Sequence, residues 1–227
     1  ELGYAERDPT NDIEGLDAAY KLTILASLAF RAKVKPEDVY REGISRLEAR
    51  DFRYARELGY AIKLLAIAKK SNGAIEVRVH PVFIPEDFLL AKVNGVYNGI
   101  QVEGDLVGKV IFYGQGAGPS ATSSAVTADV VAIAQRINYR IGNIQKLAFS
   151  AGKNIKPMSE VETRYYFRMN VADQPGVLAQ ISKILGDHHI SISSVIQKES
   201  DPAAQAAEIV IMTCLLYTSP SPRDRTR

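Results

Sequence analysis

The sequence predicts an α/β protein in which a larger unit is followed by a small α+β unit. In the first part, segments with helical spacing of apolar residues are interspersed with segments in which apolar and polar residues alternate. A polar stretch at 155–162 then precedes a second series of strand, helix, strand and strand. We therefore expect a first domain at 1–150, a linker at 151–163 and a second domain at 164–213.

The composition excludes several classes of protein. The chain has 227 residues, of which 46% are hydrophobic and 24% are charged, which is ordinary for a globular protein. Its formal charge of +2 gives no electrostatic basis for binding nucleic acid. The longest apolar stretch, Leu22–Phe30, is far shorter than the roughly 20 residues needed to cross a bilayer. We expect neither nucleic acid nor a membrane as a partner.

The cysteine and histidine content points to a cytoplasmic protein without a metal site. The single cysteine, Cys214, excludes a disulfide framework and fits a reducing compartment. No spacing of cysteine and histidine resembles a zinc site, and His80 is expected on the polar side of a strand.

Both ends of the chain are unusual. The chain begins with Glu1 rather than methionine, and its last residues, "CLLYTSPSPRDRTR", turn abruptly polar after an apolar run. This ending resembles the translation of a transposase-type sequencing adapter. We therefore exclude 214–227 from the fold prediction as an artefact, and we expect the chain to be part of a longer protein.

Three helical segments are predicted near the start. A first helix is expected from about Gly15 to Phe30, because apolar residues recur there near helical spacing: Leu16, Ala19, Leu22, Leu25, Ala26 and Ala29. Pro36 and the acids after it are typical of a helix start. The segment "LEARDFRYAREL" predicts an amphipathic helix that ends at Gly59.

Strands follow these helices. Periodicity alone does not decide whether "AIKLLAIAKK" is a strand or a helix, but its length and the turn at Ser71–Gly73 favour a strand. The alternating segment "AIEVRVHP" predicts a half-buried strand that ends at Pro81. The segments "GVYNGIQV" and "LVGKVIFY" predict a hairpin, and "SATSSAVTADVVAIAQRI" predicts a long helix.

The stretch "GYAERDPTNDIEGLDAAYK", Gly3–Lys21, places five carboxylates beside Lys21. Asp17 and Lys21 are four residues apart, so on a helix they share a face. One interpretation is an exposed ion pair of little consequence, with Asp8 and Asp12 as turn or cap residues. In the other interpretation Lys21 borders the apolar run, is partly desolvated and exchanges a proton, while Asp17 orients it. Other carboxylates of the loop would then hold a substrate ammonium.

The Gly3–Lys21 motif resembles the signature of the homoserine dehydrogenases. Later blocks, "LGYAIKLLAIAK", "RVHPVFIP" and "YGQGAG", resemble blocks of the same family in the same order, so the likeness extends to about Ile141. It implies a mixed β-sheet with helices mainly on one face, and a homodimer or higher homo-oligomer. It also implies interconversion of L-homoserine and L-aspartate 4-semialdehyde with NAD or NADP, in the biosynthesis of threonine, methionine and isoleucine.

The resemblance assigns roles by position. Lys21 would exchange a proton with the substrate C4 oxygen, and Asp17 would orient Lys21 and the substrate hydroxyl. Glu6 would bind the substrate amino group, with Asp12 assisting.

A glycine cluster at Gly114, Gly116 and Gly118 lies between a predicted strand and a predicted helix. By itself it is either an ordinary tight turn or a helix start whose N–H groups face an anion, and it is not a G-x-G-x-x-G fingerprint. The resemblance implies that it approaches the nicotinamide end of the cofactor, with Gly116 nearest, although the family usually has proline where this chain has Gln115. A dinucleotide-binding domain is not recognisable in the sequence. We therefore expect the chain alone to be inactive, and its NAD or NADP preference and any fused aspartate kinase stay open.

The second unit, with "YYFRMNVADQPGVLAQISKILGDHHISISSV", resembles a truncated ACT domain, a regulatory module of amino-acid biosynthesis. The resemblance implies an effector site at Asp173 and Gly176 and L-threonine as the effector. The plainer interpretation is that Asp173 caps a helix and Gly176 permits the turn. A second hypothesis for the whole chain is a non-catalytic amino-acid-binding regulator, against which the Asp17 and Lys21 pair argues.

Overall fold

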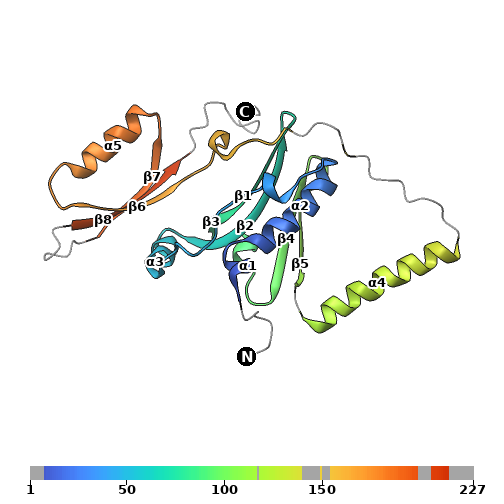
Figure 1. Ribbon diagram of the computed structural model, residues 1–227. Helices are drawn as coiled ribbons and strands as arrows, with labels where there is room; N and C mark the ends of the chain where they lie inside the picture. The colour runs from blue at the N-terminus through green and yellow to red at the C-terminus, as the bar shows by residue number, and fades with distance from the viewer. Residues whose placement is uncertain (1–7, 117, 140–148, 150–153, 199–205, 215–227) are drawn as a thin grey trace, which may run out of the picture. The chain divides into compact units, whose positions relative to one another are not determined.

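The computed structural model describes residues 8–116, 118–139, 149, 154–198 and 206–214. The chain divides into two compact units, Glu1–Ser159 and Glu160–Arg227, which are shown in Figure 1. Each unit has a β-sheet of its own. The α/β class and the small α+β unit that the sequence predicts are both confirmed.

A mixed three-stranded sheet forms the centre of the first unit. Its strand order is β1-β3-β2, with β1 parallel and β2 antiparallel to β3, and the strands are β1 (Tyr40–Arg41), β2 (Tyr60–Ser71) and β3 (Ala74–Pro85). Asn72 and Gly73 join β2 to β3 with φ of 50° and 77°. Two consecutive positive φ angles define a type I′ hairpin turn, which Asn-Gly favours. The predicted turn and the predicted strand at "AIKLLAIAKK" are therefore confirmed.

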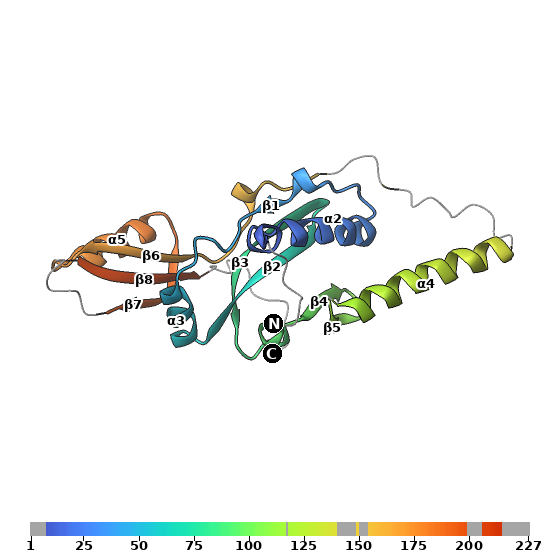
Figure 2. The ribbon, with the colours of Figure 1, turned by 60° about the horizontal axis from the view of Figure 1, so that its bottom comes forward.

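Helix α2 covers one face of this sheet. It is preceded by a short helix and followed by a 3₁₀ turn and a third helix; the bounds are α1 (Thr10–Ile13), α2 (Leu16–Phe30), η1 (Pro36–Asp38) and α3 (Ala49–Glu57). Figures 1 and 2 both show α2 lying across β2 and β3. The apolar side of α2 packs on the inward residues of β3, and together they form a core that includes Ala19, Leu22, Ala26, Ile75, Val77 and Val79. The α2 helix, the alternation along β3 and the glycine after α3 (Gly59, φ 79°) agree with the sequence prediction.

Strand β3 does not end at Pro81, which corrects the sequence prediction. It continues to Pro85 and pairs with β2 over its whole length, with Pro81 opposite Leu64. The parallel pairing with β1 ends at Val79. Beyond that point β3 has a strand partner on only one side among the described residues, and an edge position tolerates a proline that has no N–H to donate.

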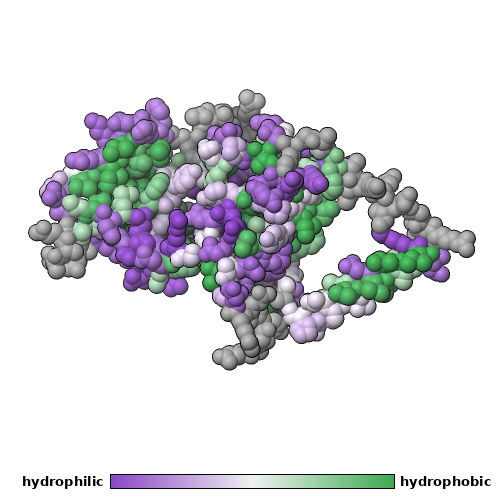
Figure 3. Space-filling model, in the orientation of Figure 1, coloured by the Kyte–Doolittle hydropathy of each residue, from purple (hydrophilic) through white to green (hydrophobic). Residues whose placement is uncertain are grey.

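A hairpin and a long helix complete the first unit. The 3₁₀ turn η2 (Leu89–Lys92) leads to the antiparallel pair β4 (Tyr97–Gly104) and β5 (Gly108–Gln115), and α4 (Pro119–Asn138) follows. The predicted hairpin and long helix are confirmed. Figure 3 shows hydrophobic side chains along much of α4. None of the helices in the described ranges is long and apolar enough to span a membrane.

The second unit is a three-stranded antiparallel sheet with one helix. Its order is β6-β8-β7, and it follows η3 (Met158–Glu160): β6 (Tyr166–Ala172), α5 (Val177–Asp187), β7 (Ser191–Gln197) and β8 (Ala206–Cys214). The central strand β8 supplies the most buried residues, Ile209, Val210 and Ile211. Cys214, which the prediction placed in the excluded tail, pairs with Ser191 at the end of β8. The rest of that tail lies outside the described residues.

Candidate active site and effector pocket

Asp17 and Lys21 form an ion pair on α2. Asp17 Oδ2 lies 2.7 Å from Lys21 Nζ, at the i,i+4 spacing that the sequence indicates. Asp17 is in the first turn of the helix, where a carboxylate is also favoured by the helix dipole. The pair thus places an ammonium group and its carboxylate partner together on one face of α2.

Lys21 is more exposed than the sequence suggested. Its side chain is 57% exposed and that of Asp17 is 46% exposed. The buried face of α2 is formed by Ala19, Leu22 and Ala26, and Lys21 lies about 100° around the helix from Leu22. The expectation that Lys21 is partly desolvated is therefore wrong for this chain by itself, because following an apolar run in sequence does not place a residue on the buried face.

The exposed face of α2 continues from this pair as an apolar stripe. Its members are exposed and lie close to Lys21 at helical spacing: Tyr20, Ile24, Leu25 and Leu28. A polar pair beside exposed apolar surface is the arrangement expected of a site that another part of a larger protein covers.

The carboxylates before α2 lie on and beside α1. Asp8 Oδ1 accepts hydrogen bonds from Thr10 Oγ1 at 2.5 Å and from Thr10 N at 3.1 Å, and these bonds lower the pKa of Asp8. Asp8 is therefore a turn residue at the start of α1, as one interpretation of the sequence held. Asp12 is exposed on α1, and Glu6 lies outside the described residues.

Gly15 connects α1 to α2 and lets α2 approach the sheet closely. It adopts the left-handed conformation (φ 70°, ψ 20°) at the start of α2. A Cβ atom at this position would lie 2.9 Å from Val79 Cγ1. Both the backbone angle and this contact favour glycine.

The three glycines of the cluster have different surroundings. Gly114 has open space on the side where a Cβ would point, since a Cβ there would have no neighbour within 4 Å. Gly116 N donates to Val96 O at 3.0 Å, and a Cβ on Gly116 would overlap the side chain of Asn98. Gly118 (φ 116°) is the N-cap residue of α4 and provides no side-chain cap. Gly116 therefore allows close packing of Asn98, whereas Gly118 has no side chain with which to cap the first turn of α4.

The face of β3 that the sequence assigned to polar residues is partly covered. Arg78 is only 4% exposed, and it pairs with the carboxylate of Glu76 and donates from Nε to His80 Nε2 at 3.0 Å. Burial of the imidazole is the main reason that the pKa of His80 is lowered; the Arg78 charge lowers it further, and the Pro81 carbonyl opposes the shift. Alternation along a strand identified the polar face correctly but not its burial.

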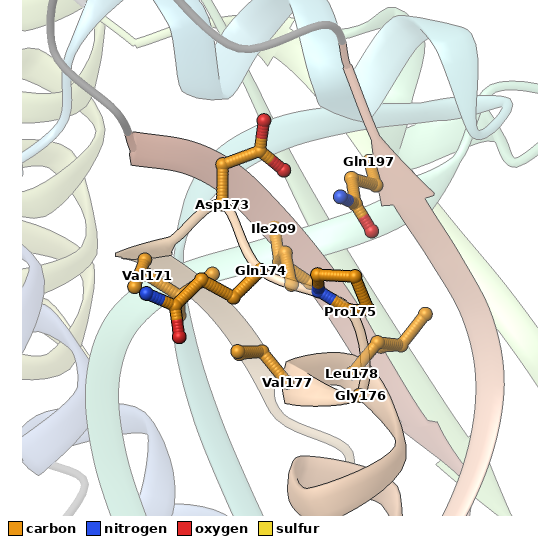
Figure 4. A pocket seen from close by; sticks show the side chains of 10 residues that line it. Val171, Asp173, Gln174, Pro175, Gly176, Val177, Leu178, Gln197 and Ile209 are labelled. Atoms are coloured by element: carbon orange, nitrogen blue, oxygen red, sulfur yellow. The ribbon is translucent and has the colours of Figure 1, made fainter.

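The second unit contains a pocket at the turn from β6 into α5. It has a volume of about 340 Å³, and Asp173 and Gly176 are among the residues that line it. Figure 4 shows the polar side chains of Asp173 and Gln197 at one side and Val177 and Leu178 at the other. Gly176 (φ 92°) is the N-cap residue of α5, so Asp173 is not the cap of that helix, contrary to the plainer interpretation of the sequence. The part of the chain that the structure describes contains no cluster of three or more potential metal ligands.

Two family models match the sequence. The homoserine dehydrogenase model matches residues 1–131, which include the Asp17–Lys21 pair, and the ACT domain model matches residues 165–216, which include the pocket. The first match alone spans more than half of the chain. The chain belongs to the homoserine dehydrogenase family.

Relatives within this family are similar over nearly the whole chain. A homoserine dehydrogenase of Neisseria gonorrhoeae is 46% identical over 93% of the chain and 50% of the relative, and one of Pseudomonas aeruginosa is 44% identical over the same shares. The solved structure of a homoserine dehydrogenase from Thiobacillus denitrificans is similar with a TM-score of 0.85 at 47% identity, over 94% of this chain and 49% of that one. An S. aureus homoserine dehydrogenase structure has a TM-score of 0.67 at 32% identity. The chain spans about half the length of the curated relatives that it matches.

One group of residues was not identified from the sequence. The segment Arg41–Ile44 contacts the connection between α1 and α2. The only local signal was a glycine, Gly43, two residues after the end of the short strand β1, and such a glycine is common in ordinary turns. The contact links residues nearly thirty positions apart, which no local pattern reveals.

Proposed function

We propose that this chain is the substrate-binding part of a homoserine dehydrogenase with an ACT regulatory domain. The enzyme would be an oxidoreductase that interconverts L-homoserine and L-aspartate 4-semialdehyde with NAD or NADP, in threonine, methionine and isoleucine biosynthesis in the cytoplasm. The observation that supports this proposal most directly is the 2.7 Å pair of Lys21 and Asp17 within the region matched by the family model. The domains would comprise 1–150 and 164–213, with a linker at 151–163.

Lys21 would serve as the proton acceptor during oxidation of the alcohol. Oxidation of homoserine breaks the C4–H bond and the O–H bond of the hydroxyl group on C4. A bound nicotinamide cofactor supplies the hydride acceptor. In reduction the Lys21 ammonium gives a proton to the carbonyl oxygen, and in oxidation the resulting amine takes the hydroxyl proton back. The Asp17 carboxylate orients the amine and stabilises the ammonium that forms.

Carboxylates of the acid loop would hold the substrate's α-ammonium group. Glu6 is the main proposed partner of this group, and Asp12, which is exposed on α1 and thus accessible to a ligand, would assist it. An ammonium paired with carboxylates forms charge-assisted hydrogen bonds that fix the orientation of a small substrate.

The nicotinamide end of the cofactor is proposed to approach the turn at Gly114, Gly116 and Gly118. Support comes from the uncapped first turn of α4, which begins at Gly118, and from the open space at Gly114. The fit is only partial, because Asn98 fills the space beside Gly116.

The ACT unit would bind an amino-acid effector such as L-threonine. The pocket beside Gly176 has a carboxylate, Asp173, suited to an ammonium group, and an amide, Gln197, suited to a carboxylate. Its volume of about 340 Å³ is sufficient for a small amino acid.

A homodimer is the proposed assembly. The hairpin β4–β5 exposes large apolar side chains, of which Leu106, at 97% exposed, is the extreme case. An isolated two-stranded hairpin is marginally stable in water, so cover by a second copy would stabilise it. Sedimentation of the chain as a monomer at micromolar concentration would contradict this assembly.

The test of the proposed function is made in a completed enzyme, in which this chain is joined to the part of the Neisseria gonorrhoeae relative that it does not match. We expect homoserine-dependent reduction of NAD or NADP, and we expect Lys21→Ala to lower kcat by about 10²- to 10⁴-fold, the usual contribution of a general acid–base group. Lys33→Ala, which removes another exposed lysine, is the matched control. Full turnover in Lys21→Ala, or threonine binding without any turnover in the completed protein, would favour the non-catalytic regulator instead.

A further inference from the structure

The connection between α1 and α2 is held by a segment distant in sequence. We call Ile13–Gly15 the junction and Arg41–Ile44 the anchor segment. Arg41 Nη1 donates to Glu14 O at 2.9 Å, and Ile44 N donates to Ile13 O at 2.9 Å. Carbonyls at the end of a helix have no partner within that helix, so the anchor segment satisfies two acceptors that α1 leaves open.

The anchor segment is itself fixed to the centre of the sheet. Tyr40 and Arg41 pair with Arg78 and Val79 of β3, and Glu42 N donates to Val79 O at 2.8 Å. Val79 is fully buried in the core under α2. The junction is therefore tied through one short segment to the most buried strand of its unit.

Gly43 makes the close approach possible. A Cβ atom there would lie 2.6 Å from Ile13 O and 2.8 Å from Glu14 Cα, both of which are backbone atoms. Its φ is not in the left-handed region, so the requirement for glycine comes from distance rather than conformation. Any larger residue at position 43 must displace the junction.

We propose that Arg41 and Gly43 are positioning residues for the reaction. This inference rests on the proposed function of Asp12, Asp17 and Lys21. The junction is the connection directly before α2, so its position sets where the first turn of α2, which contains Asp17, lies and where Asp17 pairs with Lys21. It also sets the end of α1, which bears Asp12. Neither Arg41 nor Gly43 has to touch the substrate to act in this way.

The first test uses the completed enzyme. We expect Arg41→Ala to lower kcat with homoserine by about tenfold, because small displacements of reacting groups are costly, while KM for the nicotinamide cofactor stays unchanged. Arg41→Lys keeps a donor for Glu14 O and should recover most of the lost kcat. Arg53→Ala, which removes an exposed arginine of α3, is the matched control. A lower Tm in Arg41→Ala with unchanged kcat and unchanged KM for homoserine would overturn the inference.

A second measurement keeps this inference separate from the proposed function. Amide hydrogen exchange of the chain as it stands reports on residues 10–21 without any need for activity. We expect faster exchange there in Arg41→Ala and Gly43→Ala than in wild type or Arg53→Ala. Absence of turnover in the wild-type completed enzyme would contradict the proposed function. Unchanged exchange at 10–21 in Arg41→Ala and Gly43→Ala would instead overturn the inference that the anchor segment positions the junction.

Discussion

At the level of single side chains, the site depends on two glycines as much as on its charged residues, because there is no room for a Cβ atom at either position. Gly15 and Gly43 both lie where a methyl group would meet neighbouring atoms within 3 Å, Val79 Cγ1 in one case and the backbone of the junction in the other. These two glycines let α1, α2 and the sheet come together beneath Asp17. Close packing at the two glycines thus helps to position the charged groups of the site.

Gly15→Ala is expected to destabilise the first unit. The left-handed backbone costs a residue with a Cβ about 1–2 kcal/mol, and the contact with Val79 adds to this. The free energy of unfolding, measured with urea, checks the prediction. Gly114→Ala serves as the control, because no atom lies within 4 Å of a Cβ at that position and its φ is not positive. Equal stabilities of Gly15→Ala and wild type would contradict the structure at this point.

The lowered pKa of His80 makes the stability of the folded chain depend on pH. Its folded-state pKa is lowered from 6.5, mainly by burial, so the unfolded chain binds a proton at higher pH than the folded chain does. The stability that the neutral His80 contributes is fully present above the pKa of His80 in the unfolded chain. It is lost as pH falls toward the pKa of His80 in the folded chain. Between pH 7.5 and 5, wild type should therefore lose more stability than His80→Gln. Equal pH slopes of wild type and His80→Gln would refute the prediction.

At the level of helices and strands, α4 differs from α2. One face of α2 is buried on the sheet, whereas α4 exposes an apolar stripe at helical spacing: Val126, Val130, Ile133 and Ile137. Figure 3 shows hydrophobic surface over much of this helix. A band of this kind on an exposed helix promotes association or dye binding.

Substitution of this band tests whether it is exposed in solution. We expect Val130→Lys combined with Ile137→Lys to reduce binding of the dye ANS to the chain, because both changes interrupt the apolar stripe. The same two charges placed on the opposite side of the helix, by Ser124→Lys with Gln135→Lys, should leave dye binding near the wild-type level. Equal dye binding by the two double variants would show that α4 does not expose this face.

At the level of the whole chain, the two compact units have separate cores. Leu22 belongs to the core of the first unit and Ile211 to that of the second. A unit with a core of its own can unfold in a cooperative transition of its own.

Truncation of each core should affect one transition only. Leu22→Ala and Ile211→Ala each remove a buried aliphatic side chain, which costs about 2–5 kcal/mol. In calorimetry we expect each variant to lower the Tm of one transition and to leave the other in place. A single transition that both variants shift equally would show that the units unfold together.

Much of the local structure was predictable from short patterns. The α2 helix follows from the spacing of apolar residues, and the β2–β3 turn follows from Asn72-Gly73, which favours two positive φ angles. The pairing of Asp17 with Lys21 follows from the i,i+4 geometry of any helix. The proposed roles of Glu6, Asp12 and the glycine cluster stay predictions.

Other features depended on parts of the chain far apart in sequence. Only the folded chain shows that β3 continues through Pro81, that Arg78 is buried, and that Lys21 is exposed. Each of these depends on which neighbour lies across from the residue, and local periodicity does not contain that information. The anchor of the junction by Arg41 and Gly43 is of the same kind. The helical repeat and turn preferences act over a few residues, so the sequence alone specifies the Asp17–Lys21 pair. The contacts that hold the start of α2 in place join residues far apart in sequence, so only the tertiary structure decides them.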